Sequence, residues 1–392
     1  MRFPRVPSNL QPNRLARAVS RIRAERRPLI DLTLTNPTRA GIRYPSGLLE
    51  PLASPAAMIY DPQPSGLPEA RAAVATDYER RGIIIAPERI VLTASTSEAY
   101  SFLFKLLCSS TGDIVMVPAP SYPLFDHLTQ LDGVCARQYR LDYHGRWEVE
   151  WASLENAWSD RVRGVLAVSP NNPTGSVLTP DELATLSARC ADRDAALILD
   201  EVFADYPLTH PVRAPERPSA RATDSGALTF RLGGLSKSTG LPQVKLGWIA
   251  IEGPEAMVGE AMEKLELISD TYLSVSTPVQ VASHSLITAG ATIRHAILAR
   301  IRENYMTLKA LVAGSTSVEL LHADAGWSAV IRVAATRSEE DLVLDLIEHD
   351  GVLVHPGFFF DFAHEAFVVV SLLPEPASFV EGVRRVLDRA HA

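Results

Sequence analysis

Two of the five lysines in this 392-residue chain, Lys237 and Lys245, lie eight positions apart in the segment Leu235–Trp248. Lys237 lies in a turn of small residues between two apolar runs that we expect to be strands. An amine that forms a Schiff base must be neutral, and a partly dry, electropositive pocket lowers the pKa of a lysine toward that state. A second cation, Lys245, would assist the shift and would bind a phosphate. Two ordinary surface lysines are the alternative, because most lysines are exposed.

Three small hydroxyl residues, Ser95, Thr96 and Ser97, follow the expected strand Arg89–Thr93 and begin an expected helix. At such a place the backbone N–H groups and the helix dipole point at one spot, which favours an anion such as phosphate. The alternative is an ordinary N-cap with Glu98 in the first helical turn.

Two further polar residues follow apolar runs. Asn172 lies between two prolines in Ser169–Gly175, which would hold its amide in a fixed direction at the carboxyl end of a sheet, where α/β proteins bind ligands. An ordinary Asn-Pro turn is the alternative. Asp200 ends the run Leu197–Leu199. Burial would raise its pKa and would call for a cationic partner, such as a protonated pyridine nitrogen. A helix N-cap is the other interpretation of Asp200.

The elements that must position these residues alternate between helical and short apolar segments from about residue 68 to residue 290. Near-continuous apolar runs are typical of buried parallel strands, and helices between them complete βα units. The sequence therefore predicts an α/β fold. The expected strands are Arg89–Thr93, Ile114–Val117, Gly164–Val168, Ala195–Leu199, Ala227–Leu232 and Leu246–Ile251. The expected helices include Pro68–Arg81, Ser97–Leu107, Pro180–Arg193, Gly253–Ile268, Pro278–Ala289 and Ile293–Ala313.

The C-terminal part of the chain has a different pattern, typical of a compact α+β unit. Its expected strands are Trp327–Val333, Val352–His355 and Phe367–Leu372, and its expected helices are Ser338–Asp350 and Pro376–His391. We therefore expect a large domain over residues 46–290. A small domain would consist of residues 1–45, as an N-terminal arm, together with residues 291–392.

Composition narrows the class of protein. A formal net charge of −8 argues against nucleic acid as the main partner, because that partner requires a basic face. No apolar run approaches the roughly 18 residues of a membrane span, and we expect neither a secretory signal nor a membrane partner. The three cysteines and ten histidines have neither disulfide nor metal-ligand spacing. We expect a cytoplasmic protein without a metal site.

In this order and spacing, the segments resemble the class I/II aminotransferase family of fold-type I pyridoxal-phosphate-dependent enzymes. The motifs are Ser236-Lys237-x-x-Gly-x-Pro with a cation eight residues on, Asn-Asn-Pro-Thr-Gly at 171–175, and Asp-Glu-Val at 200–202. The resemblance extends from about residue 32 to the last strand. It implies a large domain with a mostly parallel seven-stranded sheet flanked by helices, a smaller α+β C-terminal domain, and pyridoxal 5'-phosphate as cofactor.

The resemblance also implies catalytic roles. Lys237 would hold the cofactor as a Schiff base and then move a proton as general base and acid. Asp200 would pair with the pyridinium nitrogen, which keeps the ring an electron sink. Asn172 would hydrogen-bond the ring hydroxyl oxygen, and Tyr122 would stack on the ring face.

The remaining cofactor contacts implied by the resemblance surround the phosphate. They come from Ser95, Thr96, Ser97, Ser236 and Lys245. Tyr60 resembles a tyrosine that reaches the phosphate of a partner subunit. That match implies a homodimer with shared active sites.

Some positions depart from the family pattern. Phe203 stands where a tyrosine is usual, and Gly234 stands where a phosphate-binding serine is common. Val369 occupies the position of the arginine that binds the substrate carboxylate, and a carboxylate without such a cation binds poorly. Arg332, a charge within an apolar run, is the candidate replacement, with Arg14 as a second. An edge-strand arginine that reaches solvent is the other interpretation of Arg332.

The same resemblance predicts an aminotransferase that exchanges an amino group between an amino acid and a 2-oxo acid. Tyr272 stands where the aspartate-specific branch has an arginine, so an apolar or aromatic donor is favoured over a dicarboxylate. Trp327 and the phenylalanines of 358–362 would line such a pocket, or would belong to the domain core.

Two alternatives remain for the activity. The missing arginine leaves a β-lyase or decarboxylase on the same site. A non-catalytic cofactor-binding effector domain, of the kind fused to GntR-type regulators, would need an N-terminal DNA-binding module. The roughly 45 residues that precede the pattern are too few for such a module.

Overall fold

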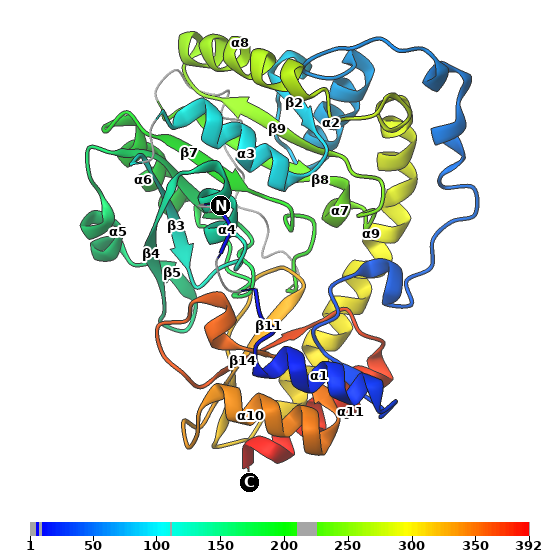
Figure 1. Cartoon of the computed structure of the whole chain (residues 1–392), viewed down its shortest axis with the longest axis vertical. Helices are drawn as coiled ribbons and strands as arrows, with labels where there is room; N and C mark the ends of the chain where they lie inside the picture. Colours follow the sequence, from blue (N-terminus) through cyan, green and yellow to red (C-terminus); the bar gives the residue numbers. More distant parts are fainter. Residues whose placement is uncertain (1–4, 8–9, 110–111, 210–225, 392) are drawn as a thin grey trace.

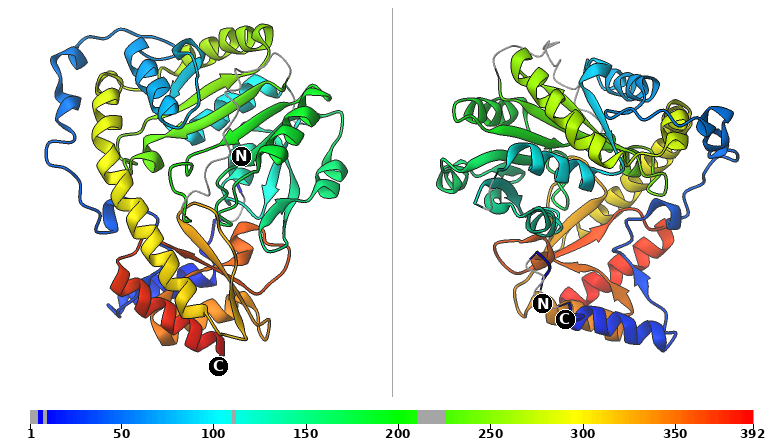
Figure 2. Two further views of the ribbon diagram at one scale, coloured as in Figure 1. Left: turned by 180° about the vertical axis from the view of Figure 1, so that it is seen from behind. Right: turned by 45° about the horizontal axis from the view of Figure 1, so that its top comes forward.

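The computed structural model describes residues 5–7, 10–109, 112–209 and 226–391. Within them an eight-stranded sheet and a four-stranded sheet each form the centre of one lobe, and the long helix α9 (Thr277–Val312) runs beside both (Figure 1). The view from behind in Figure 2 shows α9 extending from the large lobe into the small one. No helix in these described ranges is long and apolar enough to cross a membrane.

The large sheet has the strand order β2-β9-β8-β7-β6-β3-β4-β5. The neighbours from β8 to β4 are parallel, whereas β9 is antiparallel to both β2 and β8, and β5 is antiparallel to β4. The strands are β2 (Ile90–Thr93), β3 (Ile114–Ala119), β4 (Cys135–Tyr143), β5 (Trp147–Val149), β6 (Val162–Val168), β7 (Ala196–Asp200), β8 (Thr229–Gly234) and β9 (Gly247–Glu252).

The expected α/β architecture is confirmed, with one correction to the number of strands. The sheet has eight strands rather than seven, and neither β4 nor β5 was among the expected runs. Strand β4 lies near the edge of the sheet and carries Arg137 and Arg140, so most of its side chains are exposed or half-buried. A strand of this kind lacks the continuous apolar run by which the interior strands were recognised.

Alternating residues of each strand point to opposite faces of the large sheet, as β9 illustrates. Ile249 and Ile251 pack in the core under α3 (Thr96–Leu107) and α8 (Glu255–Tyr272). Trp248 and Ala250 pack on the other side with α2 (Pro68–Arg80) and α9. Farther along that second face, α5 (Trp151–Ala157) and α6 (Pro180–Ala191) cover β4 and β6.

The small sheet is antiparallel throughout, with the order β10-β11-β14-β13. One face packs on α9, α10 (Glu339–Asp345) and α11 (Pro376–His391), while Val330 and Val369 point the other way. A second, two-stranded sheet joins β1 (Ile30–Asp31) in parallel to β12 (Val352–Leu353). The strands of the small sheet are β10 (Val318–Leu320), β11 (Ser328–Val333), β13 (His355–Pro356) and β14 (Phe367–Ser371).

The N-terminal helix α1 (Arg14–Ala24) belongs to the small lobe, where it lies against α10 (Figure 1). We expected an N-terminal arm here and did not predict this helix. Its Leu15, Ala18 and Ile22 form a buried stripe with a helical period, which explains why the segment packs as a helix.

One continuous helix, α9, replaces the two helices expected around residue 290. We expected a break because Gly290 weakens a helix, yet it lies in a buried part of α9. A Cβ built on Gly290 would lie 2.5 Å from the Thr239 Cβ, so the glycine permits close packing instead of ending the helix. The division into domains at residue 290 stays a proposal, since that residue lies within α9.

Candidate active site

Lys237 lies in the short helix α7 (Leu235–Ser238), directly after β8. Its amine nitrogen lies 5.2 Å from the ring centroid of Trp327 and 5.7 Å from that of Phe203. Burial lowers the pKa of Lys237, and the negative charge of Asp200 raises it in part. The net lowering brings the amine closer to its neutral, nucleophilic form.

Hydrogen bonds from the side chains of Tyr206 and Arg294 hold the backbone at Lys237. The Tyr206 hydroxyl donates to the carbonyl oxygen of Lys237 (2.5 Å), and Arg294 Nε donates to that of Ser238 (2.8 Å). Arg294 comes from α9 and belongs to an ion cluster in which the side chains of Arg294, Asp77 and Asp205 are buried and that of Arg80 reaches the surface. Helices α2 and α9 and the segment after β7 therefore position the turn that carries the lysine.

The carboxylate of Asp200 lies buried at the carboxyl end of β7. The Tyr100 hydroxyl donates to Asp200 Oδ2 (2.6 Å), and the Val202 N–H donates to Oδ1 (3.1 Å). Burial raises the pKa of Asp200, and these two hydrogen bonds together with the charge of Lys237 oppose that rise without cancelling it. A cation placed beside this carboxylate would complete its ionisation.

The N-terminus of α3 lies next to the lysine turn. Ser95 is its N-cap, with Oγ accepting the Glu98 N–H (3.2 Å), and the N–H group of Thr96 in the first turn lacks a helical partner. Gly247 allows this approach, because a Cβ there would lie 3.0 Å from Thr96 N. Gly247 is also the β-sheet partner of Gly234, the N-cap of α7. The arrangement forms an anion-binding corner beside Lys237.

Lys245 and Ser236 flank this corner. Lys245 precedes Gly247 by two residues and is exposed, with a left-handed backbone (φ 63°). No ion pair to Lys245 occurs among the residues that the structure describes. Ser236 is half-buried in α7, next to the catalytic candidate Lys237. An exposed ammonium on a side chain that starts two residues from Gly247 would suit a phosphate at this corner.

Two loops from neighbouring strands meet in the same region. Asn171 Nδ2 donates to Ser121 Oγ (3.1 Å), which joins the loop after β6 to the loop after β3. Asn172 is half-buried, and its Oδ1 lies 3.5 Å from Ser328 Oγ at the start of β11. Burial, followed by the charge of Asp200, raises the pKa of Tyr122. The Tyr122 ring contacts Phe125 (5.9 Å), which contacts Tyr100 (5.4 Å), the donor to Asp200, so Tyr122 belongs to the same constellation.

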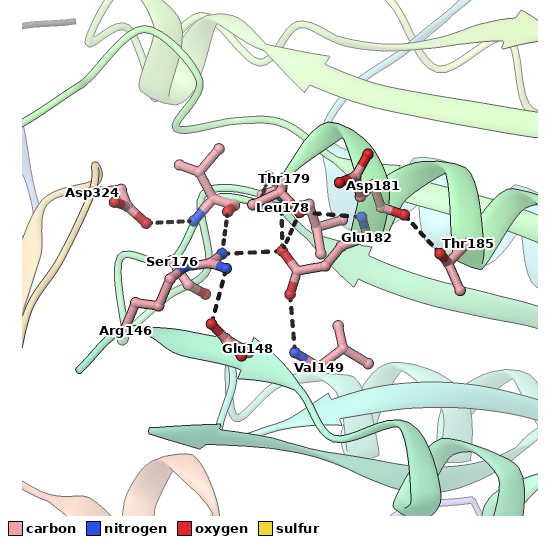
Figure 3. Close-up of polar contacts among 12 residues, drawn as sticks. Arg146, Glu148, Val149, Ser176, Leu178, Thr179, Asp181, Glu182, Thr185 and Asp324 are labelled. Atoms are coloured by element: carbon pink, nitrogen blue, oxygen red, sulfur yellow. Dashed lines mark hydrogen bonds and ion pairs between the residues drawn. The ribbon is translucent and has the colours of Figure 1, made fainter. Parts of the chain in front are cut away.

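The chain after Asn172 is held by the polar network of Figure 3. Glu182, in the first turn of α6, accepts hydrogen bonds from Thr179 N (2.8 Å), Val149 N (3.2 Å) and Arg146 (3.0 Å). Burial alone would raise the pKa of Glu182, but these bonds lower it below its ordinary value. Thr179 and Glu182 also form a capping box, which explains why α6 begins where it does.

A junction of backbone hydrogen bonds connects this loop to the small lobe. The Gly175 carbonyl accepts the N–H groups of Asp324 (2.9 Å) and Ala325 (3.0 Å). The Leu208 N–H donates to the Asp324 carbonyl (2.9 Å), and the Gly326 N–H donates to the Tyr206 carbonyl (2.9 Å). Trp327, whose ring faces Lys237, follows directly in the chain. The two lobes therefore meet beside the lysine amine.

Other residues expected at the site lie elsewhere. Tyr60 is 75% exposed and lines a groove of about 420 Å³ that includes Gln63 and Gln280 but not Lys237. Arg332 lies on β11 in an exposed ion pair with Glu319. Its role as a carboxylate partner stays a prediction, and this ion pair gives that prediction no support.

The second candidate for binding the substrate carboxylate, Arg14, and the aromatic residues expected around the substrate also have defined positions. Arg14 pairs with Glu340 on the surface (2.7 Å). Val369 is buried in the small sheet, and Phe360 is core, as the alternative interpretation of the phenylalanines held. Tyr272 is exposed, 5.3 Å from the ring of Phe102.

Sequence reasoning missed the residues that support the expected ones. Tyr100 lies on the buried stripe of α3, where an aromatic residue is indistinguishable from ordinary core. Arg294 carried a weak signal, a charge within the apolar stripe of a helix. Tyr206 carried none. Among the described residues, no cluster of three or more histidine, cysteine or acidic side chains could hold a metal.

Comparison with known proteins gives the same picture over the whole length. The family model "Aminotransferase class I and II" matches residues 51–378. An alanine aminotransferase of Mycobacterium tuberculosis is 26% identical over 382 residues, covering 94% of this chain and 86% of that protein. A glutamate-pyruvate aminotransferase of Escherichia coli is 27% identical over 275 residues, covering 69% and 65%.

Solved structures share the fold. An alanine aminotransferase from Pyrococcus furiosus superposes with a TM-score of 0.85 at 20% identity, covering 96% of both chains. An aminotransferase from Escherichia coli gives a TM-score of 0.84 at 23% identity, covering 97% of this chain and 95% of that one. The match of the family model over most of the chain shows that this protein belongs to the class I and II aminotransferases, a family of pyridoxal-phosphate-dependent enzymes.

Proposed function

We propose that this enzyme transfers an amino group from an apolar amino acid to a 2-oxo acid, with the two substrates binding in turn. The observation that carries the proposal is the place of Lys237, in the turn directly after β8 and against the rings of Trp327 and Phe203, beside strand β7, which ends in the buried carboxylate of Asp200. Such a pair supplies both the amine nucleophile and the anion that pyridoxal phosphate chemistry requires.

The residues present fit pyridoxal phosphate. The first turn of α3 and Lys245 offer N–H donors and a positive charge for the phosphate, at the corner next to α7. Asp200 offers a buried carboxylate for the ring nitrogen. The Asn172 amide is free to donate to the ring oxygen, because its Oδ1 is the atom that faces Ser328. When bound, the cofactor would supply an electron sink for the substrate Cα.

The residues of the chain would then have separate tasks. Lys237 Nζ would take the proton from the substrate Cα as general base. As general acid it would then give that proton to the cofactor carbon. The rings of Trp327 and Phe203 would exclude water from that amine, since both are buried against it. Tyr122 would cover one face of the cofactor ring. Tyr206 and Arg294 would keep Lys237 in place through its backbone.

The substrate class follows from what surrounds the amine. The rings of Trp327 and Phe203 lie 5.2 Å and 5.7 Å from the Lys237 amine, which favours an apolar side chain over a second carboxylate. The relatives are named alanine, glutamate-pyruvate and valine-pyruvate aminotransferases. The first and third names support alanine or valine as donors and pyruvate as an acceptor to test first, and the second adds glutamate as the donor to compare with them.

The experiment is a spectral titration of the purified holoenzyme with single amino acids in the absence of any 2-oxo acid. We expect alanine or valine to convert the cofactor to its pyridoxamine form, with one equivalent of 2-oxo acid released, and pyruvate to reverse the conversion. Continuous release of ammonia without an acceptor would instead establish elimination. A cofactor spectrum that no amino acid changes would contradict the proposal.

We also propose a homodimer in the cytoplasm, with active sites shared between subunits. The residues Met58, Ile59 and Tyr60 are 88%, 67% and 75% exposed, beside the groove that Tyr60 lines. Three neighbouring apolar side chains are unfavourable in water. A second copy of the chain would cover this run and would bring Tyr60 to the phosphate corner of its neighbour. The three cysteines are free thiols, in keeping with a reducing compartment.

Complementation tests the shared site. Lys237→Ala and Tyr60→Phe variants, unfolded and refolded together, would form heterodimers with one intact site. Mixed refolding should therefore restore activity well above that of either variant refolded alone. Light scattering gives the mass of the particle, and a monomeric mass would overturn the proposal.

A further inference from the structure

Tyr100 has no part in the roles discussed so far, although it contacts the centre of the site. It lies in α3, 3% exposed, and its hydroxyl donates to Asp200 Oδ2 over 2.6 Å. Among the described residues it is the one side chain that hydrogen-bonds to Asp200, the other donor being the Val202 N–H.

The short distance and the burial make this contact strong. A hydroxyl that donates to a carboxylate over 2.5–2.7 Å is a charge-assisted hydrogen bond. Burial, and then the charge of Asp200, holds the pKa of Tyr100 well above its ordinary value, so Tyr100 keeps its proton and remains a donor. Burial also works against the charge of Asp200, and the Tyr100 hydrogen bond is the largest opposing influence.

The position of Tyr100 in α3 links two parts of the site. Thr96 begins the helix at the anion corner, and Tyr100 follows one turn later, about 6 Å along the axis. The Tyr100 ring also packs edge-on against Phe125 (5.4 Å), which in turn contacts Tyr122 (5.9 Å). One rigid helix therefore sets the separation between the phosphate end of the site and the carboxylate.

We propose that Tyr100 is the positioning residue for Asp200, because its hydroxyl keeps the carboxylate charged and aimed at the ring nitrogen of the cofactor. This inference rests on the proposed function for the identity of that nitrogen. The hydrogen bond itself does not depend on it. Removing the hydroxyl should leave a carboxylate that is more readily protonated and that is held only by the Val202 N–H.

The test is Tyr100→Phe, with Tyr139→Phe as its matched control. Tyr139 is equally buried and donates to a backbone carbonyl, that of Leu166 (2.9 Å), away from the lysine turn. We expect Tyr100→Phe to weaken pyridoxal phosphate binding about ten- to a hundredfold, the range for losing a hydrogen bond to a charged group. The visible spectrum of the bound cofactor and kcat should change with it, whereas KM for the amino acid should not.

A second readout avoids the cofactor. In cofactor-free protein, carboxyl infrared bands assigned by comparison with Asp200→Asn give the protonation of Asp200 against pH. Tyr100→Phe should move this titration to higher pH, and Tyr139→Phe should not. If Tyr100→Phe matches Tyr139→Phe in titration, spectrum and affinity, the inference is wrong. If the titration moves but the wild-type enzyme transaminates nothing, the proposed function fails while the Tyr100–Asp200 relationship stands.

Discussion

Gly290 of α9 packs directly on Thr239, two residues beyond Lys237, with a distance of only 2.5 Å between the Thr239 Cβ and a Cβ built on Gly290. Gly290→Ala should therefore push α9 away from the lysine turn. Overpacking costs about 1–3 kcal/mol, and the better helix propensity of alanine returns up to about 1 kcal/mol. We expect a net loss of about 1 kcal/mol in the free energy of unfolding, together with a lower kcat. Denaturant unfolding and steady-state kinetics measure the two.

The control for Gly290 is Gly259, an exposed glycine of α8 with no atom within 4 Å of a built Cβ. Gly259→Ala should stabilise the protein by about 0.5–1 kcal/mol through helix propensity alone. Equal effects of the two substitutions would contradict the packing argument.

Arg294 should be needed for stability as well as for position. Arg294→Met leaves Asp77 and Asp205 to Arg80 alone and removes the shorter of two hydrogen bonds to the Ser238 carbonyl, the other coming from Tyr206 (3.3 Å). Breaking a buried ion cluster typically costs about 3–5 kcal/mol, and the remaining Arg80 places the expected loss near the lower end. Lys264→Met in the exposed pair with Glu260 is the control, with an expected change below about 1 kcal/mol. A loss equally small in both variants would show that the cluster contributes little.

The lowered pKa of Lys237 predicts that this residue destabilises the folded, cofactor-free protein to an extent that depends on pH. Between its lowered value and the ordinary 10.5, the folded state binds fewer protons than the unfolded state at this residue. The contribution of Lys237 to the free energy of unfolding therefore rises with pH in that window. At neutral pH, Lys237→Met should unfold at higher denaturant concentration than wild type, and the gain should shrink as the pH approaches 10.5. If the stability gained by Lys237→Met did not change with pH, the charge of Lys237 would not be its cause.

The same Lys237→Met substitution should abolish the general base. Rates should fall roughly 10²- to 10⁴-fold, the usual contribution of a positioned proton acceptor. Single-turnover kinetics with alanine as donor measure this loss.

Lys245 should matter for cofactor affinity and little for folding, because it is exposed at the anion corner. Lys245→Gln should weaken pyridoxal phosphate binding about tenfold at low salt. The difference should diminish as salt screens the charge. Fluorescence titration of cofactor-free protein measures both, with exposed Lys309 of α9 as the site of the control substitution. A salt-independent difference would assign another role to Lys245.

Interior strands of the large sheet were predictable because burial on both faces demands continuous apolar runs, as in Ala196–Asp200. Strand β4 escaped prediction because its arginines face solvent near the edge of the sheet. The break expected near Gly290 illustrates a second limit, since a glycine weakens a helix locally while a distant contact determines whether the helix continues.

Within the site, sequence motifs identified residues whose side chains have an evident chemical function, such as the amine of Lys237. The residues that position them are recognised only by distance. Tyr100 looks like core in the sequence until its hydroxyl is found 2.6 Å from Asp200. Arg332 shows the converse, a charge in an apolar run that turned out to pair with Glu319 on the surface.

The junction in which the Gly175 carbonyl accepts the N–H groups of Asp324 and Ala325 is a main-chain junction, and the Asp324 carboxylate adds one side-chain bond to it by accepting the Val177 N–H (3.2 Å). Main-chain bonds do not depend on which side chains flank them, so the two bonds to Gly175 do not require an aspartate at position 324. The contact between the lobes beside the lysine amine is therefore kept when that side chain is exchanged, although the bond to Val177 is lost. The scaffold that holds the site is in this way partly independent of the side chains around it.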